Sequence, residues 1–268
     1  MISLHNKNAV IYGAGGSLGG AVAKAFAAAG ARVFLSGIRA GKVQMVADGI
    51  NAAGGYAEAA EVDALDEKAV HEHIRSIGRV DISFNAAWNG VVQGIPLTDI
   101  SVKDFVAPVQ MGIQSRFITA VAAVKVMKQQ RSGVILNLTA TPGGIGYPYT
   151  GGFAPLCAAI ESLSRNLATE FGVYGIRSVN IRSGGSPDSQ VFKDAIASKP
   201  DVMTAVLSSM EADTMLKKMP MMEDITNAAV FLVSDMAASI TGVTIDITVG
   251  TTAALNYRVN LPTFNGDR

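Results

Sequence analysis

The stretch Val10-Ile11-Tyr12-Gly13-Ala14-Gly15-Gly16-Ser17-Leu18-Gly19-Gly20 decides the fold of this chain. Its apolar start predicts a short buried strand, and the apolar spacing that follows, up to Gly30, predicts a helix. Glycines between a strand and a helix allow a tight turn and bring the free amides of the helix start toward a pyrophosphate. An ordinary tight turn is the alternative reading. The loop residues expected to contact a dinucleotide are Gly13, Gly15, Ser17, Leu18 and Gly19.

Short β-rich runs alternate with longer segments of helical spacing along the rest of the chain. Such alternation predicts the α/β class, with a Rossmann-type doubly wound parallel sheet of about seven strands and helices on both faces. A capping box at Ser101 to Asp104 predicts the start of one helix, with Asp in place of the usual Glu. The predicted strands are Ala9–Tyr12, Arg32–Ser36, Tyr56–Val62, Val80–Asn85, Val134–Thr139, Ser178–Arg182 and Thr244–Thr248.

The composition limits the classes of partner. The 268 residues carry 22 basic and 22 acidic side chains, and this zero net charge argues against a nucleic-acid partner. No apolar stretch is long enough to span a membrane and no secretory signal precedes the first strand, so we expect a cytoplasmic protein without a membrane partner. One cysteine and three histidines predict no metal site.

No repeat or low-complexity linker divides the chain, so we expect a single domain over 1–268. One segment, 183–222, breaks the rhythm and holds six of the eleven methionines. These methionines either fill gaps in a loosely packed helical pair or belong to a variable lid over an apolar substrate. The position of the segment after a strand end favours the lid, because open sheets bind ligands there.

The end of the second predicted strand distinguishes the two nicotinamide cofactors. An acidic side chain there suits the ribose 2′-hydroxyl of NAD, and a basic one suits the 2′-phosphate of NADP. The chain has Arg39 and Lys42 and no acid from Val33 to Ala47. NADP(H) is therefore favoured over NAD(H); the alternative is that Arg39 is an ordinary solvated charge.

Further short motifs accompany the glycine loop. Val62 and Asp63 follow the third predicted strand, Asn85-Ala86-Ala87 follows the fourth, and Ile240-Thr241-Gly242 lies near the end. With these motifs, nearly the whole chain resembles the short-chain dehydrogenase/reductase family. The family's loop reads Thr-Gly-x-x-x-Gly-x-Gly, so Tyr12 stands in the place of Thr and Ser17 replaces the middle Gly.

The resemblance implies a cofactor site, a small-molecule substrate and a homo-oligomer, either a tetramer or a dimer. Trp88 replaces the last Gly of the family's motif after the fourth strand, and either closes over the nicotinamide or simply packs. Besides the glycine loop and Arg39, the residues implied to contact the cofactor are Val62, Asp63, Asn85, Ala86 and Ala87.

The chain departs from the family at the catalytic positions. Active members carry an Asn, a Ser and a Tyr-x-x-x-Lys motif, in which the lysine lowers the pKa of the tyrosine that moves the proton. An alignment without gaps places Gly112, Ala140, Phe153 and Cys157 at these four positions. Neither Ala nor Phe donates a proton, and a neutral thiol does not replace an ammonium group.

Three hydroxyl groups near these positions are candidate replacements. Thr139 and Thr141 flank the Ser position, and Tyr149, like Tyr147, lies on the glycine-rich loop before Phe153. The alternative is that the tyrosines pack against the pocket and that the threonines bond the local backbone. Cys157 is interpreted as a buried structural cysteine rather than a nucleophile, because no histidine lies near it in the sequence.

Two functions fit these patterns. The first is an NADP-dependent oxidoreductase with a non-standard active site, which transfers a hydride to or from a small carbonyl, enone or imine and relies on positioning of the reactants. Its proton would come from Tyr149, a threonine hydroxyl or water. The second is a catalytically inactive relative that binds a nucleotide or small molecule, or acts as a partner subunit. The retained glycine loop favours the first function.

Overall fold

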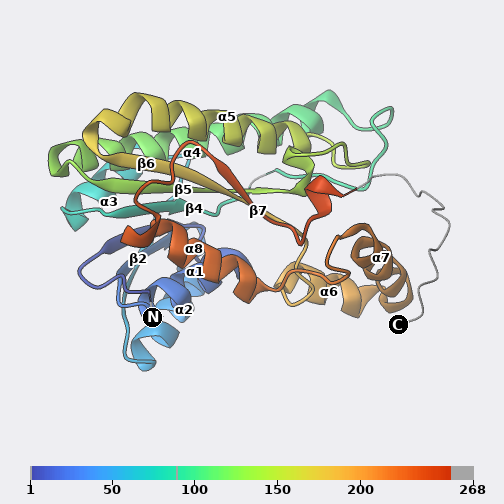
Figure 1. Ribbon diagram of the computed structural model, residues 1–268, viewed down its shortest axis with the longest axis horizontal. Helices are drawn as coiled ribbons and strands as arrows, with labels where there is room; N and C mark the ends of the chain where they lie inside the picture. The colour runs from blue at the N-terminus through green and yellow to red at the C-terminus, as the bar shows by residue number, and fades with distance from the viewer. Residues whose placement is uncertain (1, 89, 255–268) are drawn as a thin grey trace, which may run out of the picture.

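The computed structural model describes residues 2–88 and 90–254; the end of the predicted domain, 255–268, lies outside them. Within these residues seven parallel strands form one sheet in the order β3-β2-β1-β4-β5-β6-β7 (Figure 1). All seven predicted strands are confirmed, with ends shifted by no more than two residues. The strands are β1 (Asn8–Tyr12), β2 (Arg32–Gly37), β3 (Tyr56–Glu61), β4 (Ile82–Asn85), β5 (Gly133–Ala140), β6 (Ile176–Ser183) and β7 (Thr244–Ile247).

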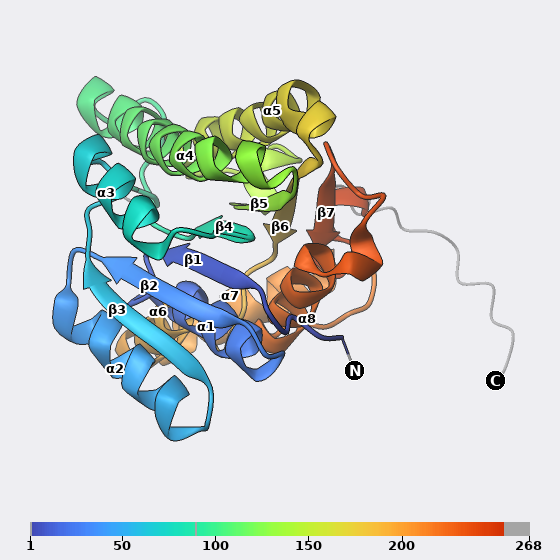
Figure 2. The same cartoon turned by 90° about the vertical axis from the view of Figure 1, so that its left-hand side faces the viewer.

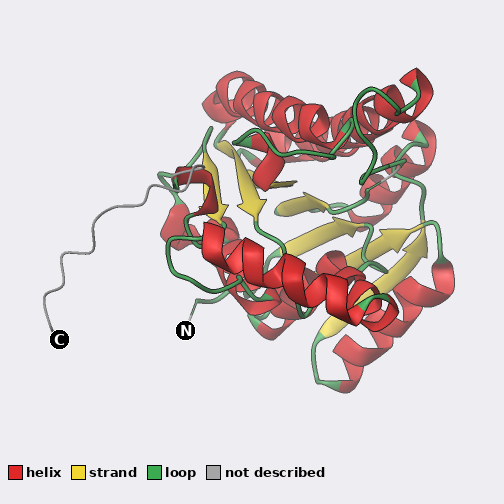
Figure 3. Cartoon of the chain, turned by 90° about the vertical axis from the view of Figure 1, so that its right-hand side faces the viewer, coloured by secondary structure: helices red, strands yellow, loops and turns green. Residues whose placement is uncertain are grey.

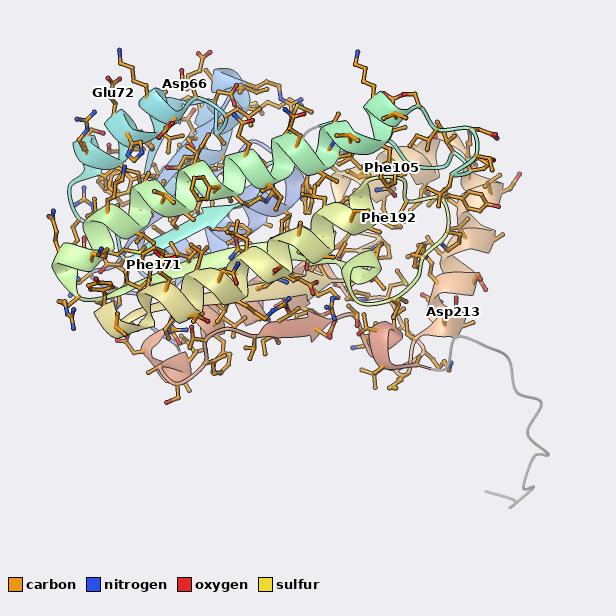
Figure 4. All side chains as sticks on the ribbon, turned by 90° about the horizontal axis from the view of Figure 1, so that it is seen from above. Asp66, Glu72, Phe105, Phe171, Phe192 and Asp213 are labelled. Atoms are coloured by element: carbon orange, nitrogen blue, oxygen red, sulfur yellow. The ribbon has the colours of Figure 1, made fainter. Side chains whose placement is uncertain are left out.

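Helices cover both faces of this sheet, as the doubly wound prediction requires (Figures 2 and 3). One face carries α1, α2 and α8, and the other carries α3, α4 and α5, of which α4 and α5 run side by side (Figure 4). The helices are α1 (Ser17–Ala28), α2 (Ala40–Ala52), α3 (Glu67–Ile77), α4 (Val102–Gln130), α5 (Phe153–Phe171), α6 (Gln190–Ser198), α7 (Pro200–Asp213) and α8 (Met222–Val233).

Strand β1 is buried on both faces because its side chains alternate between two cores. Ala9 and Ile11 pack with α1, α2 and α8, whereas Val10 and Tyr12 pack with α3, α4 and α5. A strand in this position is apolar throughout rather than alternating. The sheet order turns in opposite directions from β1, toward β2 and toward β4, so the carboxyl end of β1 lies at the topological switch point.

The predicted cap of α4 is present in part. The hydroxyl of Ser101 accepts a hydrogen bond from the backbone amide of Asp104 at 3.1 Å. The carboxylate of Asp104 accepts from the Ser101 hydroxyl at 2.8 Å. Aspartate is one methylene shorter than the usual glutamate, and it bonds the hydroxyl of the cap residue instead of its backbone amide.

The segment 183–222 contains the helical pair α6 and α7, as one of the two interpretations of its methionines expected (Figure 1). The pair follows the carboxyl end of β6, which brings it to the same edge of the sheet as the glycine loop. Its methionines occupy both environments, since Met219 is buried while Met215 and Met221 are exposed. No helix in the described part of the chain is long and apolar enough to cross a lipid bilayer.

The core under α1 and α2 gives a stability prediction. Leu35 of β2 is fully buried there, so Leu35→Ala should lower the free energy of unfolding by about 2–5 kcal/mol. The matched control is Leu97→Ala, at a side chain that is 69% exposed, where the change should be about 0.5 kcal/mol or less. Urea unfolding followed by circular dichroism measures both values. Equal losses in the two variants would contradict the described packing.

Candidate functional site

The glycine loop is held in a conformation that side chains would prevent. Gly13 has a φ of +73°, and a Cβ added there would lie 2.8 Å from the backbone nitrogen of Ala87. A Cβ added at Gly19 would collide with the carbonyl oxygen of Gly13. The backbone amide of Gly16 donates to that same carbonyl at 3.0 Å. The absence of side chains therefore brings β1, α1 and the loop after β4 together at one point.

A cleft of about 530 Å³ opens beside this loop at the carboxyl ends of the strands. The segment 183–222 and α8 border it from the other side, through residues that include Ser186, Ser189, Phe192 and Ile225. The position of 183–222 after a strand end is consistent with this place, but the sequence carries no motif that singles out these four residues. The residues predicted to bind a cofactor that line the cleft are Gly13, Gly15, Ser17, Leu18, Gly19, Arg39, Val62, Asp63, Ala86 and Ala87.

Asn85 is the one predicted cofactor residue that does not border the cleft. Its side-chain oxygen accepts from the amide of Ala87 at 2.9 Å, and its side-chain nitrogen donates to Thr119 at 3.1 Å. The buried asparagine therefore fixes the loop that faces Gly13. The side chain acts on the shape of the cleft from behind.

Two serines line the cleft near the start of α6, and one of them bonds that helix. The hydroxyl of Ser17, at the family's middle glycine position, accepts from the backbone amide of Gln190 at 3.1 Å. This bond ties the glycine loop to the first turn of α6. Ser186 is buried in the cleft wall, and its hydroxyl has no partner among the described residues. A buried hydroxyl of this kind can still bond a ligand.

Another part of the cleft wall contains two of the four residues expected at catalytic positions. Ala140 and Phe153 line it, and the Phe153 ring meets the ring of Trp88 edge-on with 5.1 Å between centroids. Trp88 also lines the cleft, so the two aromatic rings together form an apolar wall. Trp88 therefore combines features of its two interpretations, because it packs on Phe153 and also lines the cleft in which a nicotinamide would lie.

Gly112 and Cys157, the other two residues expected at catalytic positions, are tightly packed. A Cβ added at Gly112 would lie 2.5 Å from a methyl group of Leu156, so Leu156 fills the space that an Asn side chain needs. Cys157 is fully buried, and burial raises the pKa of its thiol to about 11. The thiol is therefore neutral at pH 7, as expected of a structural cysteine.

The three candidate replacements do not meet at one place. Thr139 borders the cleft, but its hydroxyl donates to Glu161 at 3.0 Å and accepts from Asn180 at 2.8 Å. The hydroxyl of Thr141 points to the carbonyl of Ser183 at 3.4 Å. Tyr149 does not border the cleft, and its side chain is 57% exposed. Local hydrogen bonding accounts for both threonines in this conformation.

The bond from Thr139 to Glu161 belongs to a largely buried polar network that no sequence motif indicates. The guanidinium of Arg182 bonds both oxygens of Glu161, at 3.0 and 2.7 Å, and also pairs with Asp246 at 3.0 Å. Helix α5 and strands β5, β6 and β7 supply these four residues. The network holds the carboxyl ends of three strands in register beneath the cleft.

Comparison with known proteins gives consistent matches over this architecture. A family model described as enoyl-(acyl carrier protein) reductase matches residues 13–252. The 7alpha-hydroxysteroid dehydrogenase of Escherichia coli is 30% identical, over 95% of this chain and 98% of its own length. The 3alpha-hydroxysteroid dehydrogenase of Mediterraneibacter gnavus is 32% identical, over 89% of this chain and 94% of its own.

Solved structures agree with the fold. A protein from Beutenbergia cavernae, described as an NAD(P)-dependent gluconate 5-dehydrogenase and solved with bound NADP, superposes with a TM-score of 0.83. It is 26% identical to this chain, with 94% of this chain and 99% of the other covered. Sorbitol-6-phosphate 2-dehydrogenase from Erwinia amylovora gives a TM-score of 0.84 at 26% identity, with 91% and 98% covered.

A substitution that adds one methyl group tests the packing of the glycine loop. Gly19→Ala should lower the free energy of unfolding by about 1–3 kcal/mol, because the methyl group collides with the Gly13 carbonyl in a closely packed turn. Gly49→Ala in the middle of α2 is the control. Its Cβ meets no atom within 4 Å, so the change should raise stability by up to about 1 kcal/mol. Thermal and urea unfolding measure the change in both variants. An unchanged free energy of unfolding in Gly19→Ala would show that the turn accommodates a methyl group and would contradict the described packing.

Proposed function

Because the chain belongs to the short-chain dehydrogenase/reductase family, we propose that it is an NADP-dependent oxidoreductase with a non-standard active site. The family binds NAD(P), and the matched relatives are dehydrogenases and reductases. The reaction is hydride transfer to or from a small carbonyl, enone or imine. The observation that carries the proposal is the cleft whose walls are the glycine loop, Arg39 and the lid segment.

The residues present fit a dinucleotide in two respects. Gly13 and Gly19 let the backbone pack so closely that the turn, and with it the first turn of α1, borders the cleft without side chains in between. The buried Ser186 hydroxyl, without a partner among the described residues, supplies a hydrogen bond inside the same cleft. In this arrangement the α1 amides would hold the pyrophosphate. Arg39, at the start of α2, would hold the 2′-phosphate, and Val62 and Asp63, which also line the cleft, would contact the adenine side.

The chain's own residues then act mainly by positioning. NADPH, when bound, supplies the hydride. Phe153 and Trp88 hold the substrate against an apolar wall, and the lid formed by α6 and α7 excludes bulk water, helped by the bond from Ser17 to the start of α6. Orientation of two reactants in this way supplies about 7–11 kcal/mol of a barrier. Because the Thr139 hydroxyl donates to Glu161, the proton comes from water in the cleft.

A second function has its own support. Leu156 closes the space at Gly112, and the buried Cys157 thiol is neutral. The positions expected for the catalytic Asn and Lys are therefore filled by apolar packing, and no other polar group among the described residues takes over their role there. This pattern favours a relative that binds a nucleotide or small molecule without turning it over, or a partner subunit. Binding of NADPH without oxidation by any carbonyl compound would identify this second function.

The cofactor proposal predicts a selective effect at Arg39. Arg39→Ala should weaken NADPH binding about 10- to 100-fold, the loss expected for charge-assisted hydrogen bonds to a phosphate, and leave NADH binding unchanged. The chain has a single tryptophan, Trp88 in the cleft wall, so energy transfer from its indole to the reduced nicotinamide reports binding. Arg32→Ala, at the amino end of β2, is the control.

Two results would count against the proposal. Equal loss of NADPH and NADH would show that Arg39 shapes the site without reading the phosphate. No binding of either nucleotide at millimolar concentration would remove the oxidoreductase function altogether.

A further inference from the structure

Arg116 is a buried cation directly behind the reactive end of the cleft. It lies on α4 one turn after Gly112, and its side chain is the largest of those fully buried among the described residues, with only 1% exposed. One guanidinium nitrogen, Nη1, donates to the carbonyl of Ala87 at 2.5 Å and to the hydroxyl of Ser115 at 3.4 Å. The guanidinium carbon lies 4.6 Å from the centre of the Trp88 ring.

The charge of Arg116 is not balanced in the part of the chain that the structure describes. No carboxylate there lies within ion-pair distance of it, and the carboxylate of Glu161 already pairs with Arg182. Burial lowers the pKa of Arg116 to about 10, so the group still carries its charge at pH 7. A buried charge without a charged partner is destabilising, and an anion that reached this guanidinium would remove that cost.

The unsatisfied atoms have a specific geometry. Nε and Nη2 of Arg116 are both buried and have no hydrogen-bond partner among the described residues. These two nitrogens form one edge of the planar guanidinium, and their N–H bonds point in parallel. That edge matches the two oxygens of a carboxylate, which it binds in a bidentate pair.

Arg116 does not itself border the cleft, but it lies directly behind residues that do. Ala87 and Trp88, its two contacts on the loop after β4, both line the cleft, and Trp88 packs on Phe153. On the α5 side, the charge of Arg116 is close enough to Cys157 to act on the pKa of that thiol. A displacement of the Trp88 ring would therefore open the guanidinium to the cleft.

We propose that Arg116 binds a carboxylate group of the substrate, so that the carbonyl compound reduced or formed in this cleft is an oxo acid or hydroxy acid. The Trp88 ring covers the guanidinium in the absence of substrate and gives up that contact when the carboxylate enters. The assignment rests on the proposed function, because it takes the cleft to be the substrate site. It also gives the apolar wall a role. A buried cation behind such a wall selects anionic substrates, because the cation stays without a charged partner when a neutral substrate binds.

Trp88 makes the proposal measurable without any turnover. NADP-loaded protein is titrated with acetoacetate and with its neutral methyl ester at constant ionic strength, and the emission of the single tryptophan is followed. Acetoacetate should change the emission with saturation, and the ester should need at least about tenfold higher concentration, as expected when a charge-assisted pair is lost. Equal responses to the acid and the ester would overturn the proposal.

Variants separate a binding role from a structural one. Arg116→Met should lose the saturable response to acetoacetate, keep NADP binding and melt at or above the wild-type temperature, because it removes an unpaired buried charge. Arg165→Met, at an exposed arginine of α5, is the control and should behave as wild type. An Arg116→Met protein with a much lower melting temperature and unchanged acetoacetate affinity would show a structural role only.

The remaining outcomes are also informative. If Arg116→Met does not fold, Arg116→Lys replaces it in the test. Lysine retains the charge but lacks the two parallel N–H donors of the guanidinium, so this variant should bind acetoacetate more weakly than wild type. A saturable response to inorganic phosphate but none to acetoacetate would contradict the carboxylate assignment. Failure to bind NADP would instead contradict the proposed function. Binding of NADP with no response to acetoacetate would contradict the role of Arg116 alone.

Discussion

The close approach of Gly13 to the backbone of Ala87 is the contact on which the rest of the site depends. It requires no side chain at Gly13 and none at Gly19, whose position faces the Gly13 carbonyl. With both absent, the end of β1, the start of α1 and the loop after β4 meet at the point where the sheet order reverses. That meeting creates the cleft, and the bond from Asn85 to the amide of Ala87 keeps the loop in place.

The fold follows from the sequence to a large extent because its signals are local. Each central strand is a short apolar run between turn residues, and a strand buried on both faces needs no alternation. The packing of the helical pair α6–α7 is harder to predict. Apolar side chains such as Val191 and Val202 are exposed, so hydrophobicity alone does not say which residues of the pair face the sheet. The boundaries also depend on hydrogen bonds between strands that are distant in sequence.

The site was only partly predictable, for a different physical reason. The glycine loop and Arg39 follow the ends of strands, and topology alone brings such positions to one edge of a sheet. Arg116 and Arg182 give no such signal, since an arginine in an amphipathic element ordinarily extends into solvent. Whether it turns inward depends on the packing of Trp88 or Glu161 around it. The same holds for the hydroxyl of Thr139, which has the right position in the sequence but donates to Glu161.

In the proposed function, the chemistry of this cleft differs from proton relay by a tyrosine and a lysine. Leu156 fills the space beside Gly112, and the Phe153 ring packs against Trp88, with Arg116 behind that aromatic wall. Arg39 borders the cleft beside the proposed cofactor phosphate. A reaction that relies on binding and orientation is compatible with such a site, because holding the reactants together accounts for much of a hydride-transfer barrier.

Hydride transfer itself is the most direct test of this account. NADPH deuterated at C4 of the nicotinamide ring is incubated with the protein and a panel of oxo acids, and the masses of the products are measured by mass spectrometry. We expect a hydroxy acid that carries one deuterium, formed in proportion to the NADPH that is oxidised. Tight binding of NADPH without deuterium in any product would contradict it and would leave a nucleotide-binding protein without this catalytic activity.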